Sequence, residues 1–359
     1  MTLSFTPIPA CAATQPFAEC HGIDLSQALD PRDIDAIGQA LLKHGLLLFR
    51  GQHGLTPEAE VAFNKAFGWH DPAQHDFLFG FGAPTTEHRV SGGAQLPDRP
   101  EVSVLGNVLL DGYHGLHNIQ LRPVLGFTYT GWHADGLHDM FDGLPELTTM
   151  FNPPGWQTQG GGSTYFTSGV RAVERMDPDL VSELARCSVA YARCPNDDAP
   201  DEARRVVPGP SRMTDEGSRR VGFAADSSDP SAGLLDFALL PEHAEGGGRH
   251  RCIHAHPITG QRSLYVTPAR SVCLLDIETG AMRHGVEETV DLLARALGPS
   301  VGPDVRYRHD WQEGDFVAWS NTLVLHSATD PSELKGPRLM HRVRLSTPKT
   351  RWAGGYASL

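Results

Sequence analysis

The sequence predicts a mainly β fold, a β-sandwich or jelly roll with helices at its flanks. Short apolar runs bounded by turn residues recur through the middle and the end of the chain, which is typical of strands. Hydrophobic residues make up 40% of the chain and charged residues 20%, as in a globular protein. We see no internal repeat, and we expect residues 1–359 to form a single domain.

The chain opens with a predicted helix, a buried strand and a second helix. Asp30 followed by proline is typical of a helix start, and Gly45 of a helix end. The apolar run 46–50 is predicted to be a buried strand. Thr56 and the proline after it begin the next helix.

The remaining elements follow from apolar runs and turn residues. Residues 72–99 are rich in Gly, Pro, His and Asp and are predicted to be a long loop, and 195–249 a polar insertion or lid. Helices are expected from about Ser168 and at 287–297. Strands are expected at 101–105, 127–132, 147–151, 254–257, 263–266, 316–319, 322–326 and 339–345.

Charge and hydropathy exclude two classes of partner. The formal net charge is -13, which disfavours binding to a phosphate backbone, although buried arginines can still bind small anions. No stretch approaches the roughly 20 apolar residues that a membrane helix needs. The N-terminus carries no secretory signal pattern, so we expect a cytoplasmic protein without nucleic-acid or membrane partners.

The cysteines do not indicate a metal site or a disulfide framework. They contain no C-x-x-C pair and are widely scattered, so we expect reduced thiols in or near the core. The six are Cys11, Cys20, Cys187, Cys194, Cys252 and Cys273.

The most informative polar cluster is His133-Ala134-Asp135, which follows a predicted strand and precedes a glycine. Residues two apart in an extended segment project to the same side, so His133 and Asp135 can bind one ion. His326 ends a later apolar strand, where it is either the third ligand or a hydrogen-bonded structural histidine. Two imidazoles and a carboxylate suit an iron(II) ion that must also bind an oxoacid and O2.

Three arginines near the C-terminus point to anion binding. Arg338, Arg342 and Arg344 share one face of a predicted strand whose other face is apolar. A surface strand could carry them for solubility. Guanidinium groups that point inward instead need anions, and paired hydrogen bonds to a carboxylate satisfy them best.

These features resemble the taurine dioxygenase and 2,4-dichlorophenoxyacetate dioxygenase (TauD/TfdA) family. The matching motifs occur in order along nearly the whole chain. They are HGLLLFRGQ at 45–53, WHAD at 132–135, GGGSTYF at 160–166, HPITGQRSLYV at 256–266, WQEGDFVAWSNTLVLHSA at 311–328 and PRLMHRVRL at 337–345.

The resemblance implies a double-stranded β-helix, a cupin-like jelly roll, with Fe(II) held by His133, Asp135 and His326. It implies 2-oxoglutarate and O2 as cosubstrates, with Thr164 and Arg338 on the distal carboxylate of 2-oxoglutarate. Asp135 argues against the related halogenases, which lack a carboxylate ligand there. The expected reaction is oxidation of an unactivated C–H bond, with release of succinate and CO2.

The substrate is predicted less fully than the metal. Arg342 matches an arginine that contacts the anionic end of the substrate in sulfonate-oxidising relatives, which implies a small anionic substrate; a structural salt bridge is its alternative. His70 and Asn107 are further substrate candidates, with an ordinary loop histidine and a structural hydrogen bond as their alternatives. The stretch 111–118 has no counterpart in the family pattern, so the substrate stays open.

Two other functions are compatible with part of this pattern. A zinc-dependent hydrolase could use the same His/Asp/His set, but it gives no reason for Arg338 and Thr164. A cupin-like binding protein would release no succinate. The resemblance also leaves a homo-oligomer open, either a dimer or a tetramer.

Overall fold

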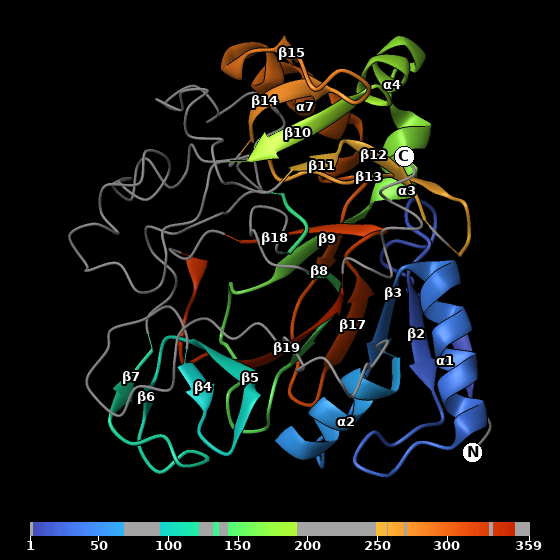
Figure 1. Cartoon of the computed structure of the whole chain (residues 1–359). Helices are drawn as coiled ribbons and strands as arrows, with labels where there is room; N and C mark the ends of the chain where they lie inside the picture. Colours follow the sequence, from blue (N-terminus) through green and yellow to red (C-terminus); the bar gives the residue numbers. More distant parts are fainter. Residues whose placement is uncertain are drawn as a thin grey trace.

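The computed structural model has a mainly β fold with flanking helices, as the sequence predicts (Figure 1). None of the helices in the part of the chain it describes is long and apolar enough to cross a bilayer. The structure describes residues 3–67, 94–121, 132–135, 143–191, 249–256, 258–268, 271–329 and 333–348.

The largest sheet has eight strands in the order β1-β2-β3-β17-β8-β19-β5-β4. Its pairings are antiparallel except for the parallel pair β2 and β3. In sheet order the strands span Ser4–Pro7, Ala18–His21, Leu46–Phe49, Phe316–Ser320, Gly143–Phe151, Leu339–Pro348, Arg99–Gly106 and Ala94–Leu96.

A three-stranded sheet in the order β16-β9-β18 supplies part of the candidate site described below. Its strands span Tyr307–His309, Thr164–Ser168 and Val324–Ala328. Every residue of β9 is buried. Ser168 then caps helix α3, Gly169–Arg175, by accepting a hydrogen bond from the backbone N–H of Arg171.

A four-stranded sheet, β11-β10-β14-β15, lies with helix α7 at the opposite end of the view from helix α2 (Figure 1). The strands span Arg249–Arg251, Cys187–Tyr191, Ser271–Asp276 and Met282–His284, and α7 spans Val286–Val301. The smaller elements are β6 (Leu109–Leu110), β7 (Ile119–Gln120), α4 (Pro178–Leu184), β12 (Ile253–Ala255) and β13 (Arg262–Leu264).

Helix α1, Pro31–His44, confirms the predicted start and end signals. The side chain of Asp30 accepts a hydrogen bond from the backbone N–H of Arg32, which satisfies one of the free donors of the first turn. Gly45 ends the helix with a φ of 73°, a backbone conformation that favours glycine. Helix α2 spans Pro57–Phe67, also as predicted.

Several expectations differ from the structure or fall outside it. The predicted loop 72–99 is wrong at its end, because Ala94–Leu96 forms β4 and Arg99 begins β5. The predicted opening of the chain is also incomplete, because β1 and β2 precede α1. Strands β6, β7, β10, β11, β14, β15 and β16 were not predicted either, because each is short and becomes a strand through its pairing with a neighbour. Most of the predicted strand 127–132, and the polar segment from 195 to 248, lie outside the described residues.

The described cysteines have reduced thiols in the core, as expected. Cys11, Cys20, Cys187, Cys252 and Cys273 are buried and free, and burial raises the pKa of Cys11 and of Cys20 to about 12. Cys194 lies outside the described residues.

An aromatic cluster packs helix α2 against strands β3 and β17 of the eight-stranded sheet. The ring of Phe63 contacts Phe49 and Phe316 edge to face, with centroids 5.7 Å and 4.9 Å away. Its other neighbour is Phe67, 4.7 Å away on the same helix. Because Phe63 is buried and the other rings pack around it, this residue anchors the helix.

We predict that Phe63→Ala lowers the free energy of unfolding by about 3–5 kcal/mol, since it leaves a cavity among packed rings. Phe67→Ala is the matched control, because this partly exposed ring lies on the same helix. We expect it to cost less than half as much. Urea denaturation followed by circular dichroism measures both, and equal losses would contradict the anchoring role of Phe63.

Candidate active site

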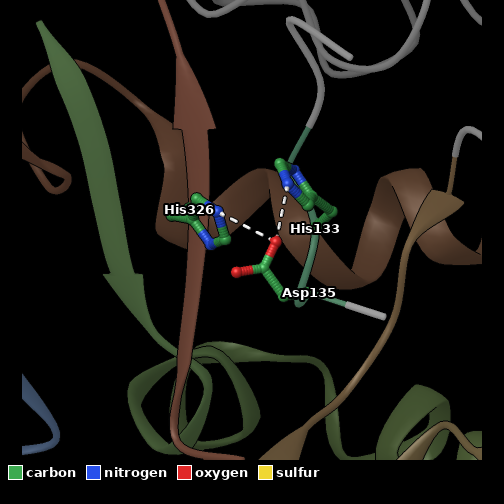
Figure 2. A group of neighbouring side chains, drawn as sticks. All are labelled: His133, Asp135 and His326. Carbon is green, nitrogen blue, oxygen red and sulfur yellow. Dashed lines mark ion pairs between the residues drawn. The ribbon is translucent and has the colours of Figure 1, made fainter. Parts of the chain in front are cut away.

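The structure brings His133, Asp135 and His326 together (Figure 2). The Nε2 atom of each histidine lies 3.8 Å from the same oxygen, Oδ1 of Asp135. The two imidazole centroids are 4.2 Å apart. Two nitrogens and one oxygen therefore surround a common point, as a facial metal site requires.

Reciprocal backbone hydrogen bonds hold the two histidines next to each other. The N–H of His133 donates to the carbonyl oxygen of His326, and the N–H of His326 donates to that of His133, both at 2.9 Å. His326 lies in β18, opposite Phe166 of β9. The short segment that carries His133 and Asp135 is thus fixed to the edge of the three-stranded sheet.

The surroundings favour the metal-binding protonation states of these groups. Burial acts to raise the pKa of the Asp135 carboxyl. The electrostatic effects of His326, Arg344 and Arg342 oppose burial and leave that pKa below its ordinary value. Burial, with His133 as a further cause, lowers the pKa of His326 to about 3, so its imidazole is neutral near pH 7. A carboxylate and a neutral imidazole are the forms that bind metals.

Arg338 lies beside a glycine turn at a second part of the site. Gly162 has a φ of 70°, and a Cβ added there would lie 2.8 Å from Cδ of Arg338. The Nε of Arg338 is buried and has no hydrogen-bond partner among the described residues. Burial lowers the pKa of this guanidinium to about 10, which still leaves it charged at neutral pH. A partly buried cation whose buried Nε can still donate is complementary to an anion.

Thr164 follows the same glycine turn, at the start of β9. Its side chain is buried, and its Oγ1 accepts a hydrogen bond from Nε1 of Trp311 at 3.0 Å. The indole can only donate, so the hydroxyl proton of Thr164 is left to donate to another group. Two groups that can each donate to an anion therefore adjoin this turn: Arg338 contacts it and Thr164 follows it in the chain.

Arg342 and Arg344 lie in β19, opposite Met150 and Thr148 of β8. Arg344 is only 4% exposed, and Arg342 is partly buried. Burial and the charge of Arg344 lower the pKa of Arg342 to about 10, and Asp135 partly opposes them. Two cations therefore stand near the proposed metal ligands.

The side chain of Asn107 forms hydrogen bonds with backbone groups. Its Oδ1 accepts from the N–H of Arg338 at 2.7 Å, and its Nδ2 donates to the carbonyl of Gly336 at 3.0 Å. Both hydrogen bonds are structural, which is the alternative role of Asn107. A substrate contact by Asn107 stays a prediction. His70 lies outside the described residues.

Sequence reasoning missed residues that surround the ligands, chiefly Thr148 and Asn321. Thr148 donates to Oδ2 of Asp135 at 2.8 Å, and Asn321 donates to Thr148 at 2.8 Å. The available signal was a polar side chain inside or next to an apolar strand, where a hydrophobic residue is usual. Trp311, the partner of Thr164, gave no such signal.

A second group of ligand-type side chains, Glu183, Cys187 and His284, is an ion-pair cluster. Arg283 donates to both carboxylate oxygens of Glu183, at 2.9 Å and 3.1 Å. His284 also lies 2.8 Å from that carboxylate. Because cations already surround Glu183, we assign it no metal.

Comparisons with known proteins show the family of this chain. The model of the family described as "Taurine catabolism dioxygenase TauD, TfdA family" matches residues 4–344. An alpha-ketoglutarate-dependent xanthine dioxygenase of Neurospora crassa is 26% identical over 360 residues, which cover 86% of this chain and 78% of that protein. The alpha-ketoglutarate-dependent 2,4-dichlorophenoxyacetate dioxygenase of Cupriavidus pinatubonensis is 26% identical over 315 residues, 86% of this chain and 87% of its own.

The fold has a match among solved structures. A crystal structure of a taurine dioxygenase from Burkholderia xenovorans superposes with a TM-score of 0.60 at 22% identity, covering 96% of this chain and 90% of that one. Since the family match spans nearly the whole chain, the chain belongs to the TauD/TfdA family and is an oxidoreductase, a dioxygenase dependent on 2-oxoglutarate (alpha-ketoglutarate).

Proposed function

We propose that this enzyme uses Fe(II), 2-oxoglutarate and O2 to oxidise an unactivated C–H bond of a small anionic substrate, releasing succinate and CO2. The observation that carries the proposal is a His/Asp/His donor set together with arginines that are partly or fully buried. The donor set suits iron(II) with positions left for other ligands, and the arginines suit carboxylates. A zinc hydrolase would need the first feature but not the second.

His133, Asp135 and His326 would hold the iron. The fit rests on ligand atoms that lie within 4.8 Å of one another and on the protonation states described above. When bound, iron and 2-oxoglutarate supply the O2-activating chemistry, which amino-acid side chains lack. The contribution of the chain is to position these groups and to neutralise their charge.

Arg338 and Thr164 would hold the distal carboxylate of 2-oxoglutarate. The buried Nε of Arg338 offers a charge-assisted hydrogen bond, and Thr164 has a hydroxyl proton left to donate. Gly162 keeps the turn close against the arginine, where any side chain would displace it.

Arg342 would bind the anionic end of the substrate. It lies on the same face of β19 as Arg344, and both lower the pKa of Asp135, so their charges lie near the metal ligands. A bound metal ion would balance the negative charge of Asp135. An anionic substrate would then balance the positive charges of Arg342 and Arg344. Substrates in the names of relatives include 2,4-dichlorophenoxyacetate, a carboxylate, and taurine, a sulfonate.

We further infer that the strands form a double-stranded β-helix. The arrangement of the candidate site supports this, because His326 comes from the three-stranded sheet and Arg342 from the eight-stranded sheet. A single domain with a lid at 195–249, a cytoplasmic location and a homo-oligomer stay predictions from the sequence.

The first test is an anaerobic titration. We expect Fe(II) and 2-oxoglutarate together, but neither alone, to give a visible metal-to-ligand charge-transfer band. His326→Ala should abolish the band, while His117→Ala, which changes an exposed histidine, should keep it. A wild-type protein without the band would favour the hydrolase or the cupin-like binding protein.

The second test separates the arginines. A panel of 2,4-dichlorophenoxyacetate, taurine and xanthine is screened for succinate release, with product mass distinguishing hydroxylation from desaturation or cyclisation. For the best substrate, we expect Arg342→Ala to raise KM by about 10- to 100-fold, as the loss of a charge-assisted hydrogen bond implies, and to leave 2-oxoglutarate affinity nearly unchanged. We expect Arg338→Ala to weaken 2-oxoglutarate binding and to leave the KM for the substrate nearly unchanged. Equal losses of both affinities in both variants would refute this division.

The third test uses the glycine turn. Gly162→Ala places a methyl group against Arg338, so we expect weaker 2-oxoglutarate binding by about 10- to 100-fold, as the loss of one hydrogen bond to a charged group implies. Gly155→Ala is the matched control, because Gly155 also has a positive φ, 89°, but nothing lies within 4 Å of its added Cβ. Titration of the charge-transfer band gives both affinities. Identical 2-oxoglutarate affinities of the two variants would contradict a role of the Gly162 turn in positioning Arg338.

A further inference from the structure

We infer that Thr148 and Asn321 are positioning residues that make Asp135 a single-oxygen metal ligand. They form an orienting relay, in which Asn321 fixes the hydroxyl of Thr148 and Thr148 fixes one oxygen of the carboxylate. The inference rests on the proposed function only in that the site binds a metal ion.

The two oxygens of Asp135 have different surroundings. Oδ1 lies 3.8 Å from Nε2 of His133 and 3.8 Å from Nε2 of His326. Both dashed lines in Figure 2 end on this oxygen, and the other oxygen points elsewhere. That other oxygen, Oδ2, accepts the hydroxyl proton of Thr148 at 2.8 Å. One oxygen is thus directed to the ligand cluster and the other is held by the protein.

Asn321 determines which way the Thr148 hydroxyl points. Its Nδ2 donates to Oγ1 of Thr148 at 2.8 Å, so the hydroxyl accepts from Asn321 and its own proton is left for Asp135. A hydroxyl has one proton to donate, and here it has one carboxylate acceptor. The relay therefore has a fixed direction from Asn321 through Thr148 to Asp135.

The amide of Asn321 is itself held in one orientation. Its Oδ1 accepts from Nε1 of Trp319 at 3.1 Å and from the backbone N–H of Asp135 at 3.3 Å. An amide flip would turn the NH2 group toward these two N–H groups and would lose both hydrogen bonds. The flipped amide is therefore strongly disfavoured.

Burial makes this relay rigid. Thr148 is 0% exposed and Asn321 1% exposed, so bulk water does not compete for their hydrogen bonds. Thr148 pairs with Trp319 in the register of β8 and β17, and Asn321 follows β17 directly. The pairing of β8 with β17 thus places Thr148 beside the strand that leads into Asn321.

The consequence concerns coordination. A carboxylate that turns both oxygens toward a metal fills an additional coordination position. With Oδ2 held by Thr148, Asp135 offers Oδ1 alone. The relay therefore stabilises the orientation in which the triad leaves room for a chelating oxoacid and a further ligand. Partners of metal ligands commonly act in this way, by orienting them.

A purely structural role is the competing explanation, because buried polar groups need partners whether or not a metal binds. The next residue on β8 offers a matched control. Thr149 is also 0% exposed, and its Oγ1 accepts from Nδ2 of Asn64 at 2.8 Å. Thr149→Val removes a buried hydroxyl without touching Asp135.

The experiment measures Co(II) binding by the full chain, with the visible bands of Co(II) reporting affinity and coordination, and urea unfolding reporting stability. We expect Thr148→Val to raise the Co(II) dissociation constant by about 10- to 100-fold, as loss of a ligand's orienting partner typically does. The bands should also change in position and intensity. Thr148→Ser keeps the hydroxyl and should restore wild-type affinity, and Thr149→Val should leave Co(II) binding unchanged.

Asn321→Asp is the second variant, should Thr148→Val fail to fold. A carboxylate at 321 accepts the Thr148 proton and so takes it from Asp135, which should weaken Co(II) binding while the hydroxyl remains. Unchanged Co(II) affinity and bands in the folded variants would overturn the relay but not the proposed function. Wild-type protein that binds no Co(II) would overturn both.

Discussion

The reciprocal hydrogen bonds between the backbones of His133 and His326 are the constraint on which the rest of the site depends. They join a segment early in the chain to a strand near its end, and they place both imidazoles beside one carboxylate. Side chains alone could not fix this distance, because each histidine has two rotatable bonds. The geometry of the candidate metal site is therefore set by backbone pairing, and the proposed ligand side chains complete it.

The second constraint is charge. Arg338, Arg342 and Arg344 lie close together in the chain; the first two are partly buried and the third is buried, and burial lowers the pKa of the first two. Such a group is costly in an empty protein, since each guanidinium loses hydration. Binding of anions, as proposed, would offset this cost and would couple ligand binding to stability. The chain as a whole has a net charge of -13, whereas this region carries three arginines close together.

The sequence predicted the parts of the fold and of the site that follow a local rule. His133 and Asp135 have the spacing of a shared face, helix α1 has its cap and its terminal glycine, and Arg342 and Arg344 alternate along a strand. Thr148 and Asn321 could not be predicted, because their role arises from a register between strands distant in sequence. Strand β4 was missed for a similar reason, since its pairing with β5 rather than its composition makes it a strand.

The hydrogen bond from Trp311 to Thr164 has a consequence for selectivity among metabolites. The indole N–H is donated to Oγ1 of Thr164, so the hydroxyl would meet the proposed carboxylate as a donor, and the guanidinium of Arg338 can only donate. Two donors are complementary to the two oxygens of a carboxylate. The amide of the same oxoacid keeps one oxygen, and its NH2 group would have to face an N–H or O–H donor. The hydrogen bond from Trp311 would thus favour a carboxylate over its neutral amide analogue.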